Sequence, residues 1–146
     1  MSKFRKLSTQ VAASPQITAE DVATAAREGF SMIINNRPDG EEDGQPSSTE
    51  IGAAAQAHGL AYRYIPVTSS GMTPERIAET VAALEEAGGR TLAYCRSGTR
   101  STFLWALAEA SRGASPQELI EAADAAGYNI SMIAGVLTDL SNKARQ

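Results

Sequence analysis

In Thr91-Leu92-Ala93-Tyr94-Cys95-Arg96-Ser97-Gly98-Thr99-Arg100-Ser101, a short apolar run ends on the only cysteine, and a loop of small residues then leads into a helical pattern. The backbone N–H groups of such a loop and of the first helical turn converge on one point, and the helix dipole adds positive potential there. Arg96 and Arg100 contribute full positive charges. The stretch therefore predicts an anion cradle around a nucleophilic Cys95 thiolate, at the carboxyl end of a strand, where open α/β sheets bind ligands.

Three side chains of this stretch are candidates for the chemistry itself. A lone cysteine is commonly a buried, inert thiol, but the strand end, the small-residue loop and the nearby arginines favour a catalytic nucleophile at Cys95. Arg100 is predicted to turn inward and to bind the oxygens of an anion with two hydrogen bonds. For Arg96 two interpretations stay open, a residue that lines the rim of the cradle or a solvated side chain.

The other loop residues are candidate substrate-binding groups. Gly98 is predicted where the loop adopts a positive φ or brings a ligand close to the backbone. The hydroxyl groups of Ser97, Thr99 and Ser101 can donate hydrogen bonds to an anion or to the Cys95 sulfur. The same hydroxyl groups are also ordinary loop and helix-capping groups, and both roles can hold together.

A second candidate segment, Arg37-Pro38-Asp39-Gly40-Glu41-Glu42, follows a predicted buried strand and so falls at the same sheet edge as Cys95. Pro-Asp-Gly is a strong turn signal, and one interpretation is a turn alone. The other interpretation makes Arg37 a second anion contact and Asp39 a polarising group or proton donor. Both interpretations stay open at this point.

The composition indicates a single domain that comprises residues 1–146 and is large enough for a proper core. Hydrophobic residues at 42% and charged residues at 21% are ordinary for a soluble globular protein. A net charge of −4 argues against nucleic acid or an anionic membrane as a partner. One cysteine forms no internal disulfide, and a lone His58 makes no metal site, so we expect no metal and no cofactor. Without a signal-peptide pattern or a run that could span a bilayer, a cytoplasmic location is expected.

Strand and helix signals alternate along the chain, which predicts an α/β fold with a largely parallel sheet. We expect strands within 4–11 and at 31–35, 61–67 and 91–95. Helices are expected after Thr18, over 49–57, after Thr73-Pro74, after the Cys95 loop and after Ser115. Thr18 forms a near capping box with Asp21. A final helix is expected to place Ile133, Val136, Leu137 and Leu140 on one face. The helix after Thr18 is predicted to bury Val22, Ala26 and Phe30. Residues 102–146 show no further strand signal.

The Cys95 loop resembles the loops of two enzyme classes. Cysteine-dependent phosphatases place five residues between the cysteine and the arginine, whereas rhodanese-type sulfurtransferases use a loop one residue shorter, often written C-R-x-G-x-R-S. Here four residues separate Cys95 from Arg100, and Ser101 stands where the phosphatase arginine would be. The local pattern is therefore rhodanese-like, although the all-helical C-terminal part resembles a phosphatase scaffold.

Three stretches together resemble one bacterial family: Ser14-Pro15-Gln16-Ile17-Thr18, Asn35-Asn36-Arg37-Pro38-Asp39-Gly40-Glu41-Glu42, and Tyr94 through Ser101 with Trp105. This family is the phosphatase-like domain that occurs alone or fused to metallo-β-lactamase-type persulfide dioxygenases (beta-lactamase hydrolase-like). The resemblance covers about residues 3–140. It implies a three-layer α/β/α sandwich with a four- or five-stranded sheet, and a protein described either as a phosphatase or as a sulfur transferase.

The preferred hypothesis from the sequence is a sulfurtransferase. The Cys95 thiolate would take sulfane sulfur from thiosulfate, glutathione persulfide or a polysulfide, and the resulting persulfide would pass its sulfur to a thiophilic acceptor such as glutathione, cyanide, sulfite or a partner cysteine. Partners would be these small molecules, with a persulfide dioxygenase alongside. One alternative is a cysteine-dependent phosphatase that uses the same cradle, and a second is a persulfide carrier or anion-sensing module that serves a partner protein without turnover.

Three departures from the phosphatase pattern weigh against that alternative. The loop is one residue short, and Tyr94 replaces the histidine that many phosphatases place before the nucleophile. No aspartate occurs between Ile51 and Tyr94, so Asp39 would have to protonate the leaving group from an earlier loop.

Overall fold

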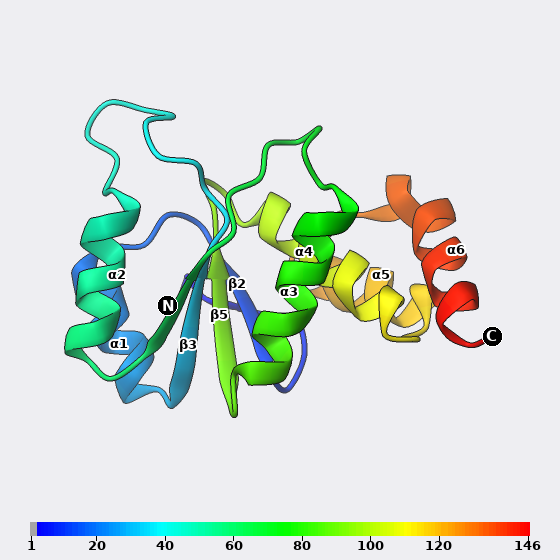
Figure 1. Ribbon diagram of the computed structural model, residues 1–146, viewed down its shortest axis with the longest axis horizontal. Helices are drawn as coiled ribbons and strands as arrows, with labels where there is room; N and C mark the ends of the chain where they lie inside the picture. Colours follow the sequence, from blue (N-terminus) through cyan, green and yellow to red (C-terminus); the bar gives the residue numbers. More distant parts are fainter. Residues whose placement is uncertain (1–2) are drawn as a thin grey trace.

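A computed structural model describes residues 3–146 and shows a five-stranded sheet with the order β1-β2-β5-β3-β4 (Figure 1). β1 (Arg5–Lys6) is antiparallel to β2 (Val11–Ser14). β2, β5 (Arg90–Tyr94), β3 (Phe30–Asn35) and β4 (Ala61–Tyr64) are all parallel. The strand that leads to Cys95 is therefore the central one, and the predicted α/β class with a mostly parallel sheet is confirmed.

Helices cover both faces of the sheet, so that the fold has three layers, with the sheet in the middle (Figure 1). α1 (Ala19–Arg27) and α2 (Ser48–Ala57) pack together on one face. α3 (Pro74–Glu86) and α4 (Thr99–Ser111) cover the other face. α5 (Pro116–Ala125), the 3₁₀ turn η1 (Ser131–Ile133) and α6 (Ala134–Ala144) follow, and α5 and α6 pack against α4. No helix within residues 3–146 is both long and apolar enough to cross a bilayer.

Local capping signals explain where the helices begin. At α1 the Thr18 side chain accepts a hydrogen bond from the Asp21 N–H, and the Asp21 carboxylate accepts one from the Thr18 N–H. This reciprocal pair satisfies two N–H groups that have no partner inside the helix. At α3 and α5 a single bond forms instead: the side-chain oxygens of Thr73 and Ser115 accept from the N–H groups of Arg76 and Glu118, and a proline follows each cap. These predicted helix starts are confirmed.

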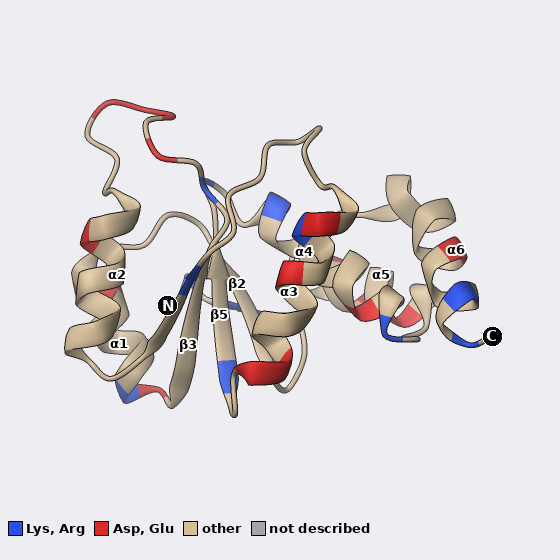
Figure 2. Ribbon diagram, in the orientation of Figure 1, with Lys and Arg blue, Asp and Glu red and all other residues tan. Residues whose placement is uncertain are grey.

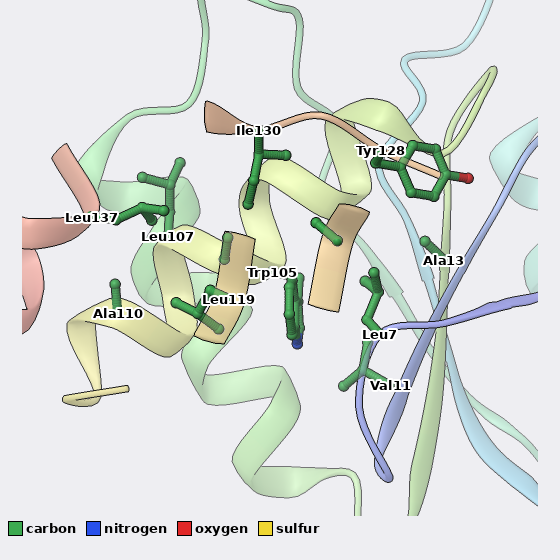
Figure 3. Packing of buried hydrophobic residues seen from close by; sticks show 12 residues of the cluster. Leu7, Val11, Ala13, Trp105, Leu107, Ala110, Leu119, Tyr128, Ile130 and Leu137 are labelled. Atoms are coloured by element: carbon green, nitrogen blue, oxygen red, sulfur yellow. The ribbon is translucent and has the colours of Figure 1, made fainter. Parts of the chain in front are cut away.

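The core lies on both faces of the central strand. Leu92 points into the cluster beneath α1 and α2, whereas Ala93 points into the cluster beneath α3 and α4, as successive strand residues must. α4 is the most deeply buried helix, since α3, α5 and α6 surround it. Figure 3 shows Trp105 and Leu107 of α4 among residues of α5, α6 and the first strands. Trp105 is thus a core residue, and the buried α4 anchors the loop that precedes it.

Several predicted boundaries were wrong. The first strand, Arg5–Lys6, does lie within the expected 4–11, but the second strand, Val11–Ser14, which a hairpin places beside β5, was missed. Phe30 belongs to β3 and not to the preceding helix, which ends at Arg27 because Gly29 takes a positive φ. The strand expected over 61–67 ends at Tyr64. On the face formed by Ile133, Val136, Leu137 and Leu140, Leu137 is fully buried, Ile133 and Leu140 are half-buried, and Val136 is 51% exposed.

Candidate active site

Cys95 lies directly after β5 at the carboxyl edge of the sheet and is fully buried. Its sulfur accepts a hydrogen bond from the Gly98 N–H at 3.1 Å. Gly98 is the N-cap of α4 and has a φ of 95°, so the chain turns sharply from strand to helix within four residues. The predicted positive φ at Gly98 is confirmed. The turn places the cysteine sulfur at the base of the α4 N-terminus, where the helix dipole favours negative charge.

The C-terminal part of the chain fixes this loop from outside. Tyr128 donates a hydrogen bond from its hydroxyl to the Ser97 carbonyl at 3.0 Å. A Cβ atom at position 98 would overlap the Tyr128 hydroxyl and would also come within 3.3 Å of the Ser14 carbonyl carbon. Gly98 is therefore required both for its backbone conformation and for the close approach of Tyr128.

Arg100 lies between Cys95 and an acidic loop. Its two terminal nitrogens donate to the Glu41 carboxylate at 2.8 and 2.9 Å, and one also donates to the Val67 carbonyl at 2.8 Å. The bond to Glu41 is the largest cause of a raised pKa for Arg100, and the neighbouring Cys95 sulfur contributes in the same direction. The guanidinium is thus held charged and oriented close to the nucleophile.

Glu41 was not among the sequence-predicted site residues, and it is the residue that connects the two arginines. Hydrogen bonds from Arg100 first, and then from Arg37, lower the pKa of its carboxyl below the ordinary value. Glu41 is therefore ionised at neutral pH and does not serve as a proton donor. The only signal in the sequence was its place four residues after Arg37, and Arg100 lies too far along the chain for that spacing to suggest the second contact.

Arg37 lies behind Glu41, and only 2% of its side chain is exposed. Its guanidinium donates to Glu41 at 2.9 Å, to the Gln16 side-chain oxygen at 3.0 Å and to Glu42 at 3.4 Å. These partners hold it in place beneath the acidic loop. A direct contact with a bound anion stays a prediction.

Asp39 is exposed, and its carboxylate accepts a hydrogen bond from the Ser48 N–H at 2.7 Å, at the start of α2. Its own N–H donates to the Tyr64 hydroxyl at 2.9 Å. This arrangement agrees with the turn interpretation of the segment, and the proton-donor role of Asp39 stays a prediction. Tyr94, which stands where many phosphatases have histidine, is buried, and burial raises the pKa of its phenol.

The remaining predicted residues differ in exposure. The Arg96 side chain is 68% exposed and lies 3.7 Å from Glu42, at the rim. The Ser97 hydroxyl donates to the Thr99 hydroxyl at 3.0 Å. The Ser101 hydroxyl oxygen is buried in the first turn of α4 and has no hydrogen-bond partner within residues 3–146. Its predicted donation to a bound anion or to the Cys95 sulfur stays a prediction.

The three stretches singled out in the sequence meet at this site. The Gln16 N–H donates to the Arg96 carbonyl at 3.2 Å, which joins the first stretch to the cysteine loop. Arg37 joins the second stretch to Gln16, and Glu41 joins it to Arg100. No group of three His, Cys, Asp or Glu side chains in the described part of the chain could hold a metal ion. The geometry is that of a buried thiol beside a guanidinium at a helix N-terminus, an arrangement whose positive potential favours an anion.

Comparison with known proteins adds to this geometry. Residues 3–112 match the family model described as the phosphatase-like domain of beta-lactamase hydrolase-like protein. A beta-lactamase hydrolase-like protein of Xylella fastidiosa is 37% identical over 120 residues, which are 82% of this chain and 28% of that protein. The chain therefore spans less than a third of the length of that curated relative.

Two solved structures share the fold over nearly the whole chain. A phosphatase candidate from Neisseria meningitidis is 32% identical, with 96% of this chain and 99% of that chain covered and a TM-score of 0.83. The structure of Tk-PTP in its active form covers 97% of both chains with a TM-score of 0.71, and at 20% identity this likeness concerns the fold alone. The sheet with its C-terminal helices is thus a tyrosine-phosphatase-like scaffold.

Proposed function

The chain belongs to the family of phosphatase-like domains of beta-lactamase hydrolase-like proteins, and from this premise we propose that it is a cysteine-dependent phosphatase. The observation that carries the proposal is the position of the Cys95 sulfur, which accepts the Gly98 N–H at the N-terminus of α4 beside the Arg100 guanidinium. A thiolate with a fixed cation and a helix N-terminus beside it is what transfer of a phosphoryl group requires.

The reaction would proceed in two displacements. The Cys95 thiolate attacks the phosphorus of a phosphate monoester, an S–P bond forms, and the P–O bond to the alcohol or phenol breaks with its electron pair on oxygen. Water then attacks the phosphocysteine, which releases inorganic phosphate and restores the thiolate. Arg100 and the first N–H groups of α4 stabilise the charge on the transferred oxygens during both steps.

The acidic groups near the cup indicate which esters react best. Glu41 is ionised, and the Asp39 carboxylate is bound to the Ser48 N–H. A departing alkoxide would find neither group ready to protonate it, whereas a phenolate is a much weaker base and needs such help less. We therefore infer that aryl phosphates are turned over much faster than alkyl phosphates.

The test is release of phosphate from para-nitrophenyl phosphate and from an alkyl phosphate by the native protein and two variants. Cys95→Ser should lose about a thousandfold or more in kcat, and Arg100→Lys about a hundredfold in kcat/KM. Retention of activity in Cys95→Ser would overturn the proposal, as would an absence of turnover with every aryl phosphate.

A second candidate, sulfur transfer, is favoured by one observation, the short spacing of four residues between Cys95 and Arg100. The Cys95 thiolate would attack the outer sulfur of thiosulfate, the S–S bond would break, and sulfite would leave with the electron pair. Cyanide or a thiol would then take the outer sulfur from the persulfide. Sulfite and thiolates are tolerable leaving groups, so this reaction needs no general acid.

Intact mass spectrometry separates the two candidates. A one-sulfur adduct formed with thiosulfate or glutathione persulfide, absent in Cys95→Ser and discharged by cyanide, would support sulfur transfer. An adduct that discharges only to a partner protein, such as a persulfide dioxygenase, would support the carrier alternative. The absence of any adduct, together with turnover of aryl phosphates, would leave the phosphatase alone.

A further inference from the structure

A cavity of about 600 Å³ adjoins the Cys95 loop, and the chemistry described above does not use it. It lies between the segment that precedes α3, the start of α4 and the start of α6. In Figure 1, the green loop before α3 and the orange beginning of α6 both lie on the upper side of the molecule, where β5 leads into α4. Its volume is in the range of sites that bind small organic molecules.

The cavity has a polar end and an apolar wall. The polar lining comprises Ser97, Thr99 and Arg100, which also belong to the anion cup, and two uncharged serines, Ser69 and Ser70, before α3. The apolar wall is made by side chains of the loop before α3, of α3, α4, η1 and α6: Met72, Ile77, Phe103, Leu107, Met132, Ile133 and Val136. A molecule with its anionic group in the cup would therefore extend directly along this wall.

The wall includes apolar side chains that the fold leaves in water. Met132 is 67% exposed and Val136 is 51% exposed. They are two of the three large hydrophobic residues that are exposed in the described part of the chain, the third being Tyr64. Covering such surface with an apolar group is favourable, and a concentration of it beside an active site marks a binding surface.

The charge around the cavity restricts the ligand further. Among its lining residues within 3–146, Arg100 alone is charged. Residues 65–73 and 125–138, which flank the cavity, contain no charged residue, and both segments are tan in Figure 2. A second phosphate or an acidic peptide would lose its hydration here without gaining a cationic partner. The part of the ligand outside the cup is thus neutral and apolar.

We propose that the substrate is a phosphate monoester of a hydrophobic phenol, with its phosphate in the Cys95 cup and its apolar group in this cavity. The proposal rests on the phosphatase function proposed above and adds the substrate class. Met132 and Val136 are specificity residues in it, and they take no part in the chemical steps.

The test uses a series of phenyl phosphates that carry a para-methyl, para-butyl or para-hexyl group. These alkyl groups hardly alter the acidity of the phenol, so the chemical step stays constant while the apolar area grows. From phenyl to para-butylphenyl phosphate, kcat/KM should rise by about tenfold or more, chiefly through a lower KM.

The double variant Met132→Ser with Val136→Ser should flatten this rise across the series. Thr138→Ser, an exposed change on α6 outside the cavity, is the matched control and should keep the full rise. Turnover that is independent of chain length, or a rise that survives in the double variant, would overturn the inference with the phosphatase function intact. No turnover of any member of the series would instead overturn the phosphatase function itself.

Discussion

Among single residues, Glu41 has the most constrained surroundings, because one carboxylate serves two guanidinium groups. Both of its oxygens accept from Arg100, and one of them also accepts from the buried Arg37. Such a two-point contact fixes the plane of the Arg100 guanidinium as well as its distance. Glu41 therefore acts as a positioning residue, which presents Arg100 to whatever anion binds beside Cys95.

Replacing Glu41 by glutamine tests this role. The amide keeps the size of the side chain but removes its charge and turns an NH₂ group toward a guanidinium. We expect kcat/KM for an aryl phosphate to fall about tenfold, mainly through KM, because Arg100 loses its orientation. Glu42→Gln is the control, since Glu42 is more exposed and its ion-pair distances are 3.4 and 3.7 Å. Equal losses in both variants, or tighter binding of inorganic phosphate by Glu41→Gln, would contradict the role.

Glu41 also makes stability depend on pH. Its pKa is lowered in the folded protein, first by the hydrogen bond from Arg100, so the ionised form is favoured on folding. That contribution to the free energy of unfolding is complete above the ordinary glutamate pKa of about 4.3 and is lost as the pH falls through the lower, folded value. Urea titrations from pH 7 to pH 3 should show the native protein losing more stability than Glu41→Gln. Parallel curves for the two proteins would argue against this assignment.

At the scale of structural elements, the turn from β5 into α4 tolerates no side chain at position 98. Gly98→Ala would strain a backbone with a φ of 95° and push a Cβ against the Tyr128 hydroxyl. Gly113→Ala is a matched control, because its φ is 98° and a Cβ there meets nothing within 4 Å. We expect Gly113→Ala to cost about 1 kcal/mol in the free energy of unfolding and Gly98→Ala about 3 kcal/mol. Chemical denaturation measures both, and equal costs would show that the contact with Tyr128 contributes nothing.

Elements specified by neighbouring residues could be predicted from the sequence. The capping pair Thr18 and Asp21 and the proline after Thr73 mark helix starts through contacts three residues apart or less. The residues 11–14, Val-Ala-Ala-Ser, were missed because they are small and few, and their strand is specified by pairing with the distant β5. The long-range contact with β5 therefore determines this strand.

The candidate site could likewise be predicted where its residues are neighbours in the sequence, and not where they are distant. Cys95, Gly98 and Arg100 lie within six residues, and their arrangement at a strand end follows from local geometry. The contact between Glu41 and Arg100 joins residues 59 positions apart and depends on how the 36–48 loop folds over the cup. Nothing in the spacing of residues contains that information, because it arises only when β3 and β5 become neighbours.

At the scale of the whole molecule, the cup draws on both layers of helices. The 36–48 loop leads into α2 on one face, while Arg100 and Tyr128 come from the other face. The central strand β5 lies between the two cores and contributes side chains to each. A site assembled in this way is intact only when both cores are formed, so we expect the domain to unfold as one cooperative unit.

Two core truncations, one on each side, test that expectation. Ile51 in the cluster under α1 and α2, and Leu137 in the cluster around α4, are both fully buried. Ile51→Ala and Leu137→Ala should each lower the free energy of unfolding by about 2–5 kcal/mol, whereas Val136→Ala, at a half-exposed position, should change it by about 0.5 kcal/mol or less. In a single cooperative unit, Leu137→Ala shifts the transitions of Trp105 fluorescence and of far-ultraviolet circular dichroism together, with an unchanged denaturant slope. If α6 instead separated from a sheet that stays folded, the fluorescence and circular dichroism transitions would have different midpoints in Leu137→Ala and the same midpoint in Ile51→Ala. The anion cup would then depend on the sheet alone.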